Sequence, residues 1–140
     1  MKKKPTLSEI EDAFLFVAMS SYGDHTAYIS KKTGEIYYSS ESGDYDELPD
    51  DDDELADCVE IPHKNDLDLG KDLVFHFVSE YIPEAIARIE KIFSKKGAYS
   101  RYKSFLEQED LLGQWYEYEN RRQSEALKQW CKDNNIDIVD

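Results

Sequence analysis

The sequence predicts an α+β fold: an N-terminal helix, a small antiparallel sheet of about three strands, and a C-terminal array of about four helices. Apolar residues recur every three or four positions near the start of the chain and again from residue 66 onward, which is the helical period. Between these regions lie short runs rich in Tyr, Ile, Thr and Ser, which are typical of strands. At 140 residues the chain is long enough for one domain with its own core, so we expect a single domain over 1–140.

The first helix is expected to run from a cap at Thr6 or Ser8 to about Ser20, with Glu9 in its favourable first turn. Its main stripe is formed by four apolar residues at helical spacing: Leu7, Ile10, Phe14 and Val17. Leu15 and other apolar side chains lie off that stripe. We therefore expect a helix that is sandwiched between other elements.

Three strands are predicted to follow, over 25–30, 35–40 and 58–61. Gly34 supplies the positive φ of a tight hairpin between the first two, and Pro62 closes the third. We expect the three strands to form a meander with one face packed on helices.

The chain is expected to be helical over 66–133. Pro83 is well placed to begin the second of these helices, and Gly97 to end it after Lys96. Further helices are predicted over 99–108 and 114–133, with a corner at 111–113. Residues 136–139 fit either a terminal strand or a loose tail.

Charge is the unusual property of this chain. It carries 31 acids against 17 bases, a net charge of −14, which disfavours a dedicated DNA reader or a protein that binds anionic membranes. No apolar run reaches the ~18 residues of a membrane span, and the lysines at positions 2–4 are followed by acids rather than by a signal-peptide core. Two cysteines are too few for a disulfide framework. These features predict a cytoplasmic protein.

Ten of the acids, and no base, lie between residues 41 and 57. We interpret this segment as a mobile, solvated loop between two strands. A calcium loop is a second interpretation, although Leu48 and Pro49 occupy positions where a ligand and a glycine belong. Mimicry of nucleic-acid phosphates is a third. The candidate acidic binding residues are Asp44, Asp46, Asp50, Asp51, Asp52 and Asp53.

Residues 88–103 form the opposite pattern, with six bases and a single acid, Glu90. Three of the bases, Arg88, Lys91 and Lys95, centre about 160° around the predicted helix from its apolar stripe, and the other three extend the positive charge beyond it. The interleaved aromatic residues are Tyr99, Tyr102 and Phe105. Such a segment binds single-stranded nucleic acid, neutralises the protein's own acidic loop or serves as a solvated helix face. The candidate basic patch consists of Arg88, Lys91, Lys95, Lys96, Arg101 and Lys103.

One catalytic arrangement is worth weighing. Asp72, His76 and Glu80 share one edge of a helix, where they form plain surface pairs or offer ligands to a metal in a hydrolase. The sequence has no phosphate loop, no serine elbow and no paired cysteine motif. We therefore predict no enzyme, no cofactor and no metal site.

The C-terminal half carries a distinctive combination of residues. Gly97-Ala98-Tyr99 opens it, Leu111-Leu112 and Trp115-Tyr116 follow, and Trp130 precedes Asn134-Asn135. This combination resembles the bacterial uncharacterised protein family 0158. The resemblance extends over nearly the whole chain, and it implies an architecture but no catalytic residues.

We read that motif as packing: Tyr99 and Tyr102 are expected to turn inward, and Trp115 and Trp130 to anchor the last helix. With its rings internal, the protein meets its surroundings through ionic surface. We therefore expect a non-catalytic cytosolic interaction or regulatory module that contacts a protein partner through charged surfaces. The alternative is single-stranded nucleic-acid binding through the basic patch.

Overall fold

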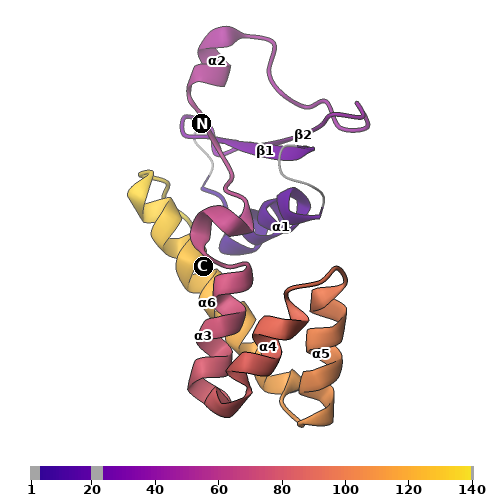
Figure 1. Ribbon diagram of the computed structural model, residues 1–140. Coiled ribbons are helices and arrows are strands. Elements are labelled where there is room, and N and C mark those ends of the chain that lie inside the picture. The colour runs from indigo at the N-terminus through magenta and orange to yellow at the C-terminus, as the bar shows by residue number, and fades with distance from the viewer. Residues whose placement is uncertain (1–3, 20–23, 140) are drawn as a thin grey trace. The chain divides into compact units, whose positions relative to one another are not determined.

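The computed structural model describes residues 4–19 and 24–139 (Figure 1). Its contacts divide the chain into two compact units. Unit 1 comprises Met1–Leu67 with Ser124–Asp140, and unit 2 comprises Asp68–Gln123. The α+β class is confirmed, because an N-terminal helix, a three-stranded antiparallel sheet and several C-terminal helices are present. The single domain expected over 1–140 stays a prediction.

Helix α1 spans Leu7–Ala18 in unit 1. Thr6 is its N-cap, and a capping box fixes its start: the Glu9 backbone N–H donates to Thr6 Oγ1 at 3.1 Å, and the Thr6 N–H donates to Glu9 Oε1 at 3.0 Å. Its expected end at Ser20 lies outside the described residues. The expectation of a sandwiched helix is wrong, since Leu15 is 52% and Met19 75% exposed. One side of α1 packs, through Ile10, Ala13, Phe14 and Val17, and the other faces solvent.

The sheet contains β1 (His25–Ser30), β2 (Ile36–Ser40) and β3 (Cys58–Glu60), all antiparallel, in the order β2-β1-β3. The expected meander is therefore wrong, because β1 and not β2 is central. A meander would have a short connection from β2 to a neighbouring β3. Here the long 41–57 segment lets the chain pass from β2 to the opposite edge of β1, where β3 pairs. The tight turn between β1 and β2 has Gly34 at φ 79°, as the hairpin interpretation requires.

Ala27 and Ile29 of β1 are fully buried, and β1 packs on α1. The Phe16 ring of α1 stacks on His25, with centroids 4.5 Å apart, and meets Tyr38 edge-on at 4.9 Å. These contacts hold the sheet and the helix together as the core of unit 1.

The acidic segment contains more regular structure than the loop interpretation predicts. Asp46 forms an isolated antiparallel bridge with Ser39, and the Glu47 N–H donates to the Tyr38 carbonyl oxygen at 3.0 Å. A short helix, α2, spans Asp52–Ala56 and is capped by the Asp51 side chain. Aspartates in a first helical turn favour the positive end of the helix dipole, which explains why so acidic a run becomes helical. Its mobility stays a prediction.

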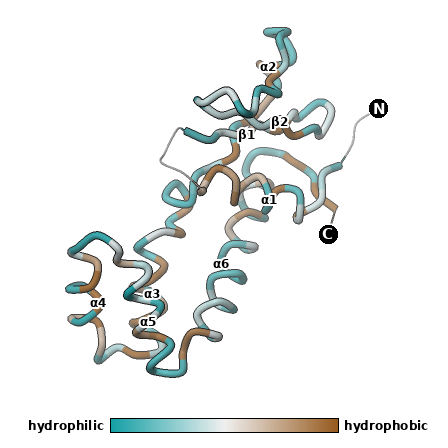
Figure 2. Tube along the Cα trace, turned by 90° about the vertical axis from the view of Figure 1, so that its right-hand side faces the viewer, coloured by the Kyte–Doolittle hydropathy of each residue, from teal (hydrophilic) through white to brown (hydrophobic). Residues whose placement is uncertain are grey.

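The helices that follow are η1 (Lys64–Leu67) in unit 1, then α3 (Lys71–Tyr81), η2 (Pro83–Ala85), α4 (Ile86–Ile92) and α5 (Ala98–Gln108) in unit 2, and finally α6 (Leu112–Asp133), which begins in unit 2 and ends in unit 1. In Figure 2, hydrophilic and hydrophobic residues alternate along α4 and α5. That alternation is the amphipathic period that predicts them.

Two predicted boundaries in this region are wrong. Helix α4 ends at Ile92 instead of Lys96, and Gly97, with φ 75°, is the N-cap of α5 and does not end α4. The corner before α6 lies at Asp110, which has φ 60°, so that Leu112 and Gly113 are already helical. In both cases a single left-handed residue reverses the chain within a few positions.

The core of unit 2 is aromatic. Trp115 and Tyr102 are 1% and 0% exposed, and Phe77 meets Trp115 edge-on with centroids 5.4 Å apart. The expectation that Tyr99 turns inward is wrong, because its ring is 38% exposed and contacts Phe93 at the rim of the core. Position 99 lies in the first turn of α5, one turn before the buried Tyr102, where the helix begins at the edge of the core.

Residues 136–139 form neither a regular strand nor a free tail. Val139 makes an isolated parallel bridge with Thr6, in which the Val139 N–H donates to the Pro5 carbonyl oxygen at 2.9 Å. Within residues 4–19 and 24–139, every helix is too short or too polar to cross a bilayer.

Candidate functional site

Four residues of the predicted basic patch surround one hollow on unit 2. Arg88, Lys91, Lys95 and Arg101 line this hollow of about 240 Å³, together with the apolar Ile92. We call it the basic hollow. Its cations come from α4, from the α4–α5 connection and from α5, and they surround the single apolar side chain of Ile92. This arrangement suits a ligand whose anionic group is attached to a short hydrocarbon chain.

Both arginines of the basic hollow also have structural contacts. Arg101 Nη2 donates to the carbonyl oxygens of Ile92 at 3.3 Å and Lys95 at 3.2 Å, and so satisfies acceptors left open where α4 ends. The Arg88 guanidinium lies over the Phe105 ring, 4.7 Å from its centroid. These contacts fix the positions of the two arginines, and the exposed Lys91 completes the rim.

The other two members of the patch lie elsewhere. Lys96 does not line the basic hollow, and Lys103 Nζ lies over the exposed ring of Tyr116, 5.6 Å from its centroid. Of the interleaved aromatic residues, Tyr102 and Phe105 are buried, and only Tyr99 is exposed. The exposed rings on this part of unit 2 are therefore Tyr99 and Tyr116, and the sequence did not single out the second.

The predicted acidic residues lie along the segment between β2 and β3, and all of them are exposed: Asp44, Asp46, Asp50, Asp51, Asp52 and Asp53. The bridge with Ser39 places Asp46 beside β2. Asp51, Asp52 and Asp53 instead form the cap and first turn of α2. No cluster of three His, Cys, Asp or Glu side chains in the described part of the chain is placed to hold a metal ion, so the calcium interpretation gains no support.

The candidate hydrolase residues Asp72, His76 and Glu80 all lie in α3 and are exposed. They are not among any metal-binding cluster within residues 4–19 and 24–139.

A pocket at one corner of the sheet contains residues that sequence reasoning did not bring together. The β1–β3 ladder pairs Tyr28 with Glu60 and Ile29 with Val59. Continued by three positions beyond Tyr28 and Glu60, the same register would place His63 opposite His25. Pairing stops first, after the Ile61 N–H donates to the Ala27 carbonyl oxygen at 2.8 Å, because the next N–H that would face β1 is that of His63, and it donates to the Asp66 carboxylate at 3.0 Å instead.

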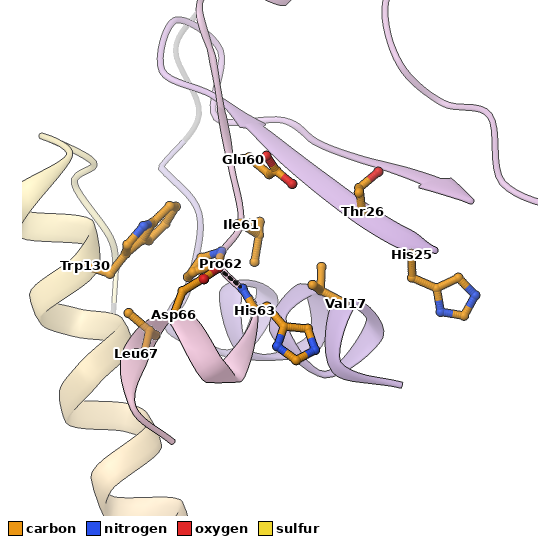
Figure 3. Close-up of a pocket in the computed structure, with 10 residues that line it drawn as sticks. All are labelled: Val17, His25, Thr26, Glu60, Ile61, Pro62, His63, Asp66, Leu67 and Trp130. Atoms are coloured by element: carbon orange, nitrogen blue, oxygen red, sulfur yellow. Dashed lines mark hydrogen bonds between the residues drawn. The ribbon is translucent and has the colours of Figure 1, made fainter. Parts of the chain in front are cut away.

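The corner pocket that results has a volume of about 300 Å³ (Figure 3). Trp130 reaches it from α6, Val17 from α1 and Thr26 from β1. Glu60 and Asp66 supply carboxylates, and the Asp66 carboxylate accepts the backbone N–H of His63 at 3.0 Å. The residues that line it also include Ile61, Leu67, Pro62, His25 and His63.

The two histidines of the corner pocket differ in their surroundings. His63 is 7% exposed, and its Nδ1 accepts the backbone N–H of Asn65 at 3.2 Å, so its neutral ring carries the proton on Nε2. His25 stacks on Phe16, and its Nδ1 is buried with no hydrogen-bond partner in the described structure. An unpaired buried nitrogen carries a desolvation cost and marks a place where a polar partner is missing.

Neither cysteine is set up as a nucleophile. Burial raises the pKa of the Cys131 thiol to about 11. Burial also raises the pKa of Cys58, with further contributions from the carboxylates of Asp57 and Glu54. A thiol with a raised pKa is largely protonated at neutral pH, which is the opposite of the activated state.

Comparison with known proteins identifies the family of this chain. A model for an uncharacterised protein family, UPF0158, matches residues 8–140. The chain belongs to this family. Comparisons with curated proteins and with solved structures return no match.

The motif on which the UPF0158 resemblance rests is largely structural in this chain. Gly97 caps α5, and Tyr102 and Trp115 are buried in the core of unit 2. Trp130 is different, because it is half-buried in unit 1 and lines the corner pocket. The sequence held no direct signal for this pocket, because the residues that line it come together only through the pairing of β1 with β3, and the expected meander did not contain that pairing.

Proposed function

We propose that this UPF0158 protein is a non-catalytic cytosolic interaction module whose charged surfaces contact a protein partner. The distribution of charge supports the proposal. Unit 1 carries 21 acids and 8 bases, whereas residues 88–103 of unit 2 carry six bases and one acid. A partner with complementary charges would meet surfaces of both signs, which favours specific over unspecific association.

The observation that carries the proposal is the basic hollow. A carboxylate side chain of a partner would accept hydrogen bonds from its rim, and the methylenes of that side chain would contact Ile92. Because Arg88 and Arg101 are already held by Phe105 and by backbone carbonyls, less side-chain entropy is lost on binding. The exposed aspartates of 50–53 are the second proposed contact surface.

The experiment uses a fluorescein-labelled peptide rich in Glu and Leu and the full chain. Charge reversal of the hollow, by Lys91→Glu with Lys95→Glu, is compared with Lys31→Glu and Lys32→Glu, which change the net charge equally in an exposed turn of unit 1. We expect the hollow variant to lose at least ~tenfold in affinity, equivalent to ~1.4 kcal/mol, and the control to lose less than ~threefold. Equal losses in both would overturn the assignment of the surface.

The partner itself is sought by affinity capture from a nuclease-treated extract of the native host, with wild-type chain, the hollow variant and a variant in which residues 50–53 are asparagine. Under the proposal, one protein is retained by the wild type and lost with at least one variant. A partner that all three retain equally would show that the charged surfaces are not the contact.

Single-stranded nucleic-acid binding is the second candidate, and one observation favours it. Tyr99 and Tyr116 are 38% and 41% exposed, and Lys103 adjoins the second ring. Exposed rings beside cations stack on bases while the cations contact phosphates. The net charge of −14 opposes it through long-range repulsion.

A labelled single-stranded oligonucleotide separates the two candidates. Binding at ~150 mM salt that Lys95→Glu weakens and deletion of residues 44–57 strengthens would favour nucleic acid. Absence of binding even after the deletion would remove this candidate and leave the protein-partner proposal.

A further inference from the structure

We propose that the corner pocket of unit 1 is a binding site for a small organic cation with an apolar body, such as an aromatic or aliphatic amine. This site is separate from the charged surfaces of the proposed function, because the residues that line it include neither a member of the basic hollow nor any of the aspartates of 50–53. Its volume of about 300 Å³ falls at the small end of the ~300–1,000 Å³ that ligand pockets occupy.

The lining of the corner pocket favours a cation over an anion. Two of its residues, Glu60 and Asp66, are carboxylates, and none of the lysines and arginines within residues 4–19 and 24–139 lines it. Hydrogen bonds from an ammonium group to a carboxylate are about twice as strong as neutral ones. The surrounding unit, with 21 acids and 8 bases, adds a negative field that attracts cations and repels anions.

The apolar part of the lining explains why an organic cation is expected. Trp130, Val17 and Leu67 provide surface for a hydrocarbon body, and the indole is the best of the side-chain rings at attracting a cation to its face. The His, Asp and Glu side chains of the pocket, by contrast, are not among any cluster in the described residues that could hold a metal ion.

The position of the polar groups is fixed by the local fold. The ladder places Glu60 opposite Tyr28, and therefore on the same sheet face as Thr26 at the open corner. The Asp66 carboxylate is held by the His63 backbone N–H at 3.0 Å. The Asp66 carboxylate, held in this way, loses little freedom when a ligand arrives, and the ladder fixes the backbone position from which the exposed Glu60 side chain reaches the ligand.

The test titrates the full chain with three probes of similar size and different charge: benzylamine, benzyl alcohol and benzoate. Heat of binding and the indole N–H signals in NMR spectra are recorded. We expect benzylamine to bind at least ~tenfold more tightly than benzyl alcohol, a difference of ~1.4 kcal/mol, and benzoate to bind more weakly than either. The indole signal of Trp130 should move, and that of the buried Trp115 should not.

Glu60→Gln is the matched variant, because it removes the charge and keeps the shape. Its control is Glu47→Gln, an exposed acid of the same unit that does not line the corner pocket. We expect Glu60→Gln to weaken benzylamine binding at least ~fivefold and to leave benzyl alcohol unchanged, while Glu47→Gln changes neither by more than ~twofold.

Three outcomes would overturn the proposal. Benzylamine and benzyl alcohol could bind equally, the two glutamate variants could weaken the amine equally, or the Trp130 signal could stay in place at saturating amine. Should Glu60→Gln prove unfolded by circular dichroism, the Trp130 signal and the order of the three probes on the wild-type chain decide the question. Failure of this site leaves the basic hollow untouched, since that lies in unit 2.

Discussion

The rings of Tyr102 and Trp115 meet edge to face, with their centroids 5.1 Å apart. One comes from α5 and the other from α6, and both are almost completely buried. Edge-to-face pairs add ~0.5–1.5 kcal/mol to the free energy gained from burial alone. This pair therefore joins two helices of unit 2. Substitutions of its two members are expected to change the free energy of unfolding in opposite directions.

Trp115→Ala is expected to lower the free energy of unfolding by ~3–5 kcal/mol, the range for truncating a core aromatic side chain. The ring that it removes is 1% exposed and also contacts Phe77. Chemical denaturation followed by circular dichroism measures the change. Tyr116→Ala, at the exposed neighbouring position, is the control and should shift the midpoint little. An unchanged midpoint for Trp115→Ala would show that this ring is not part of the core.

Tyr102→Phe is expected to stabilise the protein, because the Tyr102 hydroxyl is buried without a hydrogen-bond partner in the described structure. Removing an unpaired buried polar group recovers part of a cost of ~1–3 kcal/mol. Burial raises the pKa of Tyr102 well above its ordinary value of 10.0, with smaller contributions from Glu119, Tyr99 and Tyr118. The unfolded chain therefore ionises first as the pH rises above that value, and stability contributed by the neutral phenol is lost.

The measurement for Tyr102→Phe is the denaturation midpoint at pH 7 and at intervals above pH 9. The variant should have the higher midpoint at neutral pH and a shallower decline at alkaline pH. A variant less stable than the wild type at pH 7 would show that the hydroxyl has a partner, such as a bound water.

Local sequence patterns predicted the elements of this fold well. The strand at 25–30 and the helix start at Thr6, one of the two caps expected, follow from the types of residues only a few positions apart in the sequence. The strand order could not be predicted in the same way. Whether β3 pairs with β1 or with β2 depends on the path of the 17-residue acidic connection before it. Hydrophobic periodicity and strand propensity describe single elements and do not indicate that path.

The candidate sites divide along the same line. Four residues that line the basic hollow belong to the basic patch predicted from the sequence. They could be grouped because they lie on one face of a predicted helix or in the segment that follows it. The corner pocket was missed, since His25, Glu60 and Trp130 are far apart in sequence and meet only through strand pairing and the last helix. The end of α4 was misplaced because Arg101, nine residues beyond Ile92, supplies the capping donor.

The two thiols are expected to react at very different rates. Cys58 is half-buried, whereas Cys131 is 1% exposed and burial raises its pKa to about 11. With a disulfide reagent at pH 8, Cys58 should react first and Cys131 only as fast as the structure opens. Cys58→Ser should abolish the fast phase and leave the slow one. Two equal rates would contradict the burial of Cys131.

The same thiol gives a pH dependence with a defined direction. Its pKa of about 11 in the folded chain exceeds the ordinary value of 9.0. Stability from the neutral thiol is therefore complete below pH 9 and is lost progressively between pH 9 and pH 11. Cys131→Ala should flatten the decline of the denaturation midpoint across this window, beyond whatever loss of packing it causes at pH 7. A decline of unchanged steepness would show that other groups cause it.

Gly97→Ala and Gly113→Ala are expected to change stability in opposite directions. Gly97 has φ 75°, and a Cβ there would lie 3.2 Å from Arg101 Nη1, the guanidinium that caps α4. Left-handed backbone costs a non-glycine residue ~1–2 kcal/mol, so Gly97→Ala should lower the free energy of unfolding by about that amount. Gly113 lies in α6 with open space around it, and alanine there should raise stability by up to ~1 kcal/mol. Denaturation midpoints of the two variants measure both effects on the same scale. If both alanines stabilised the chain, residue 97 would not adopt the left-handed conformation that separates α4 from α5.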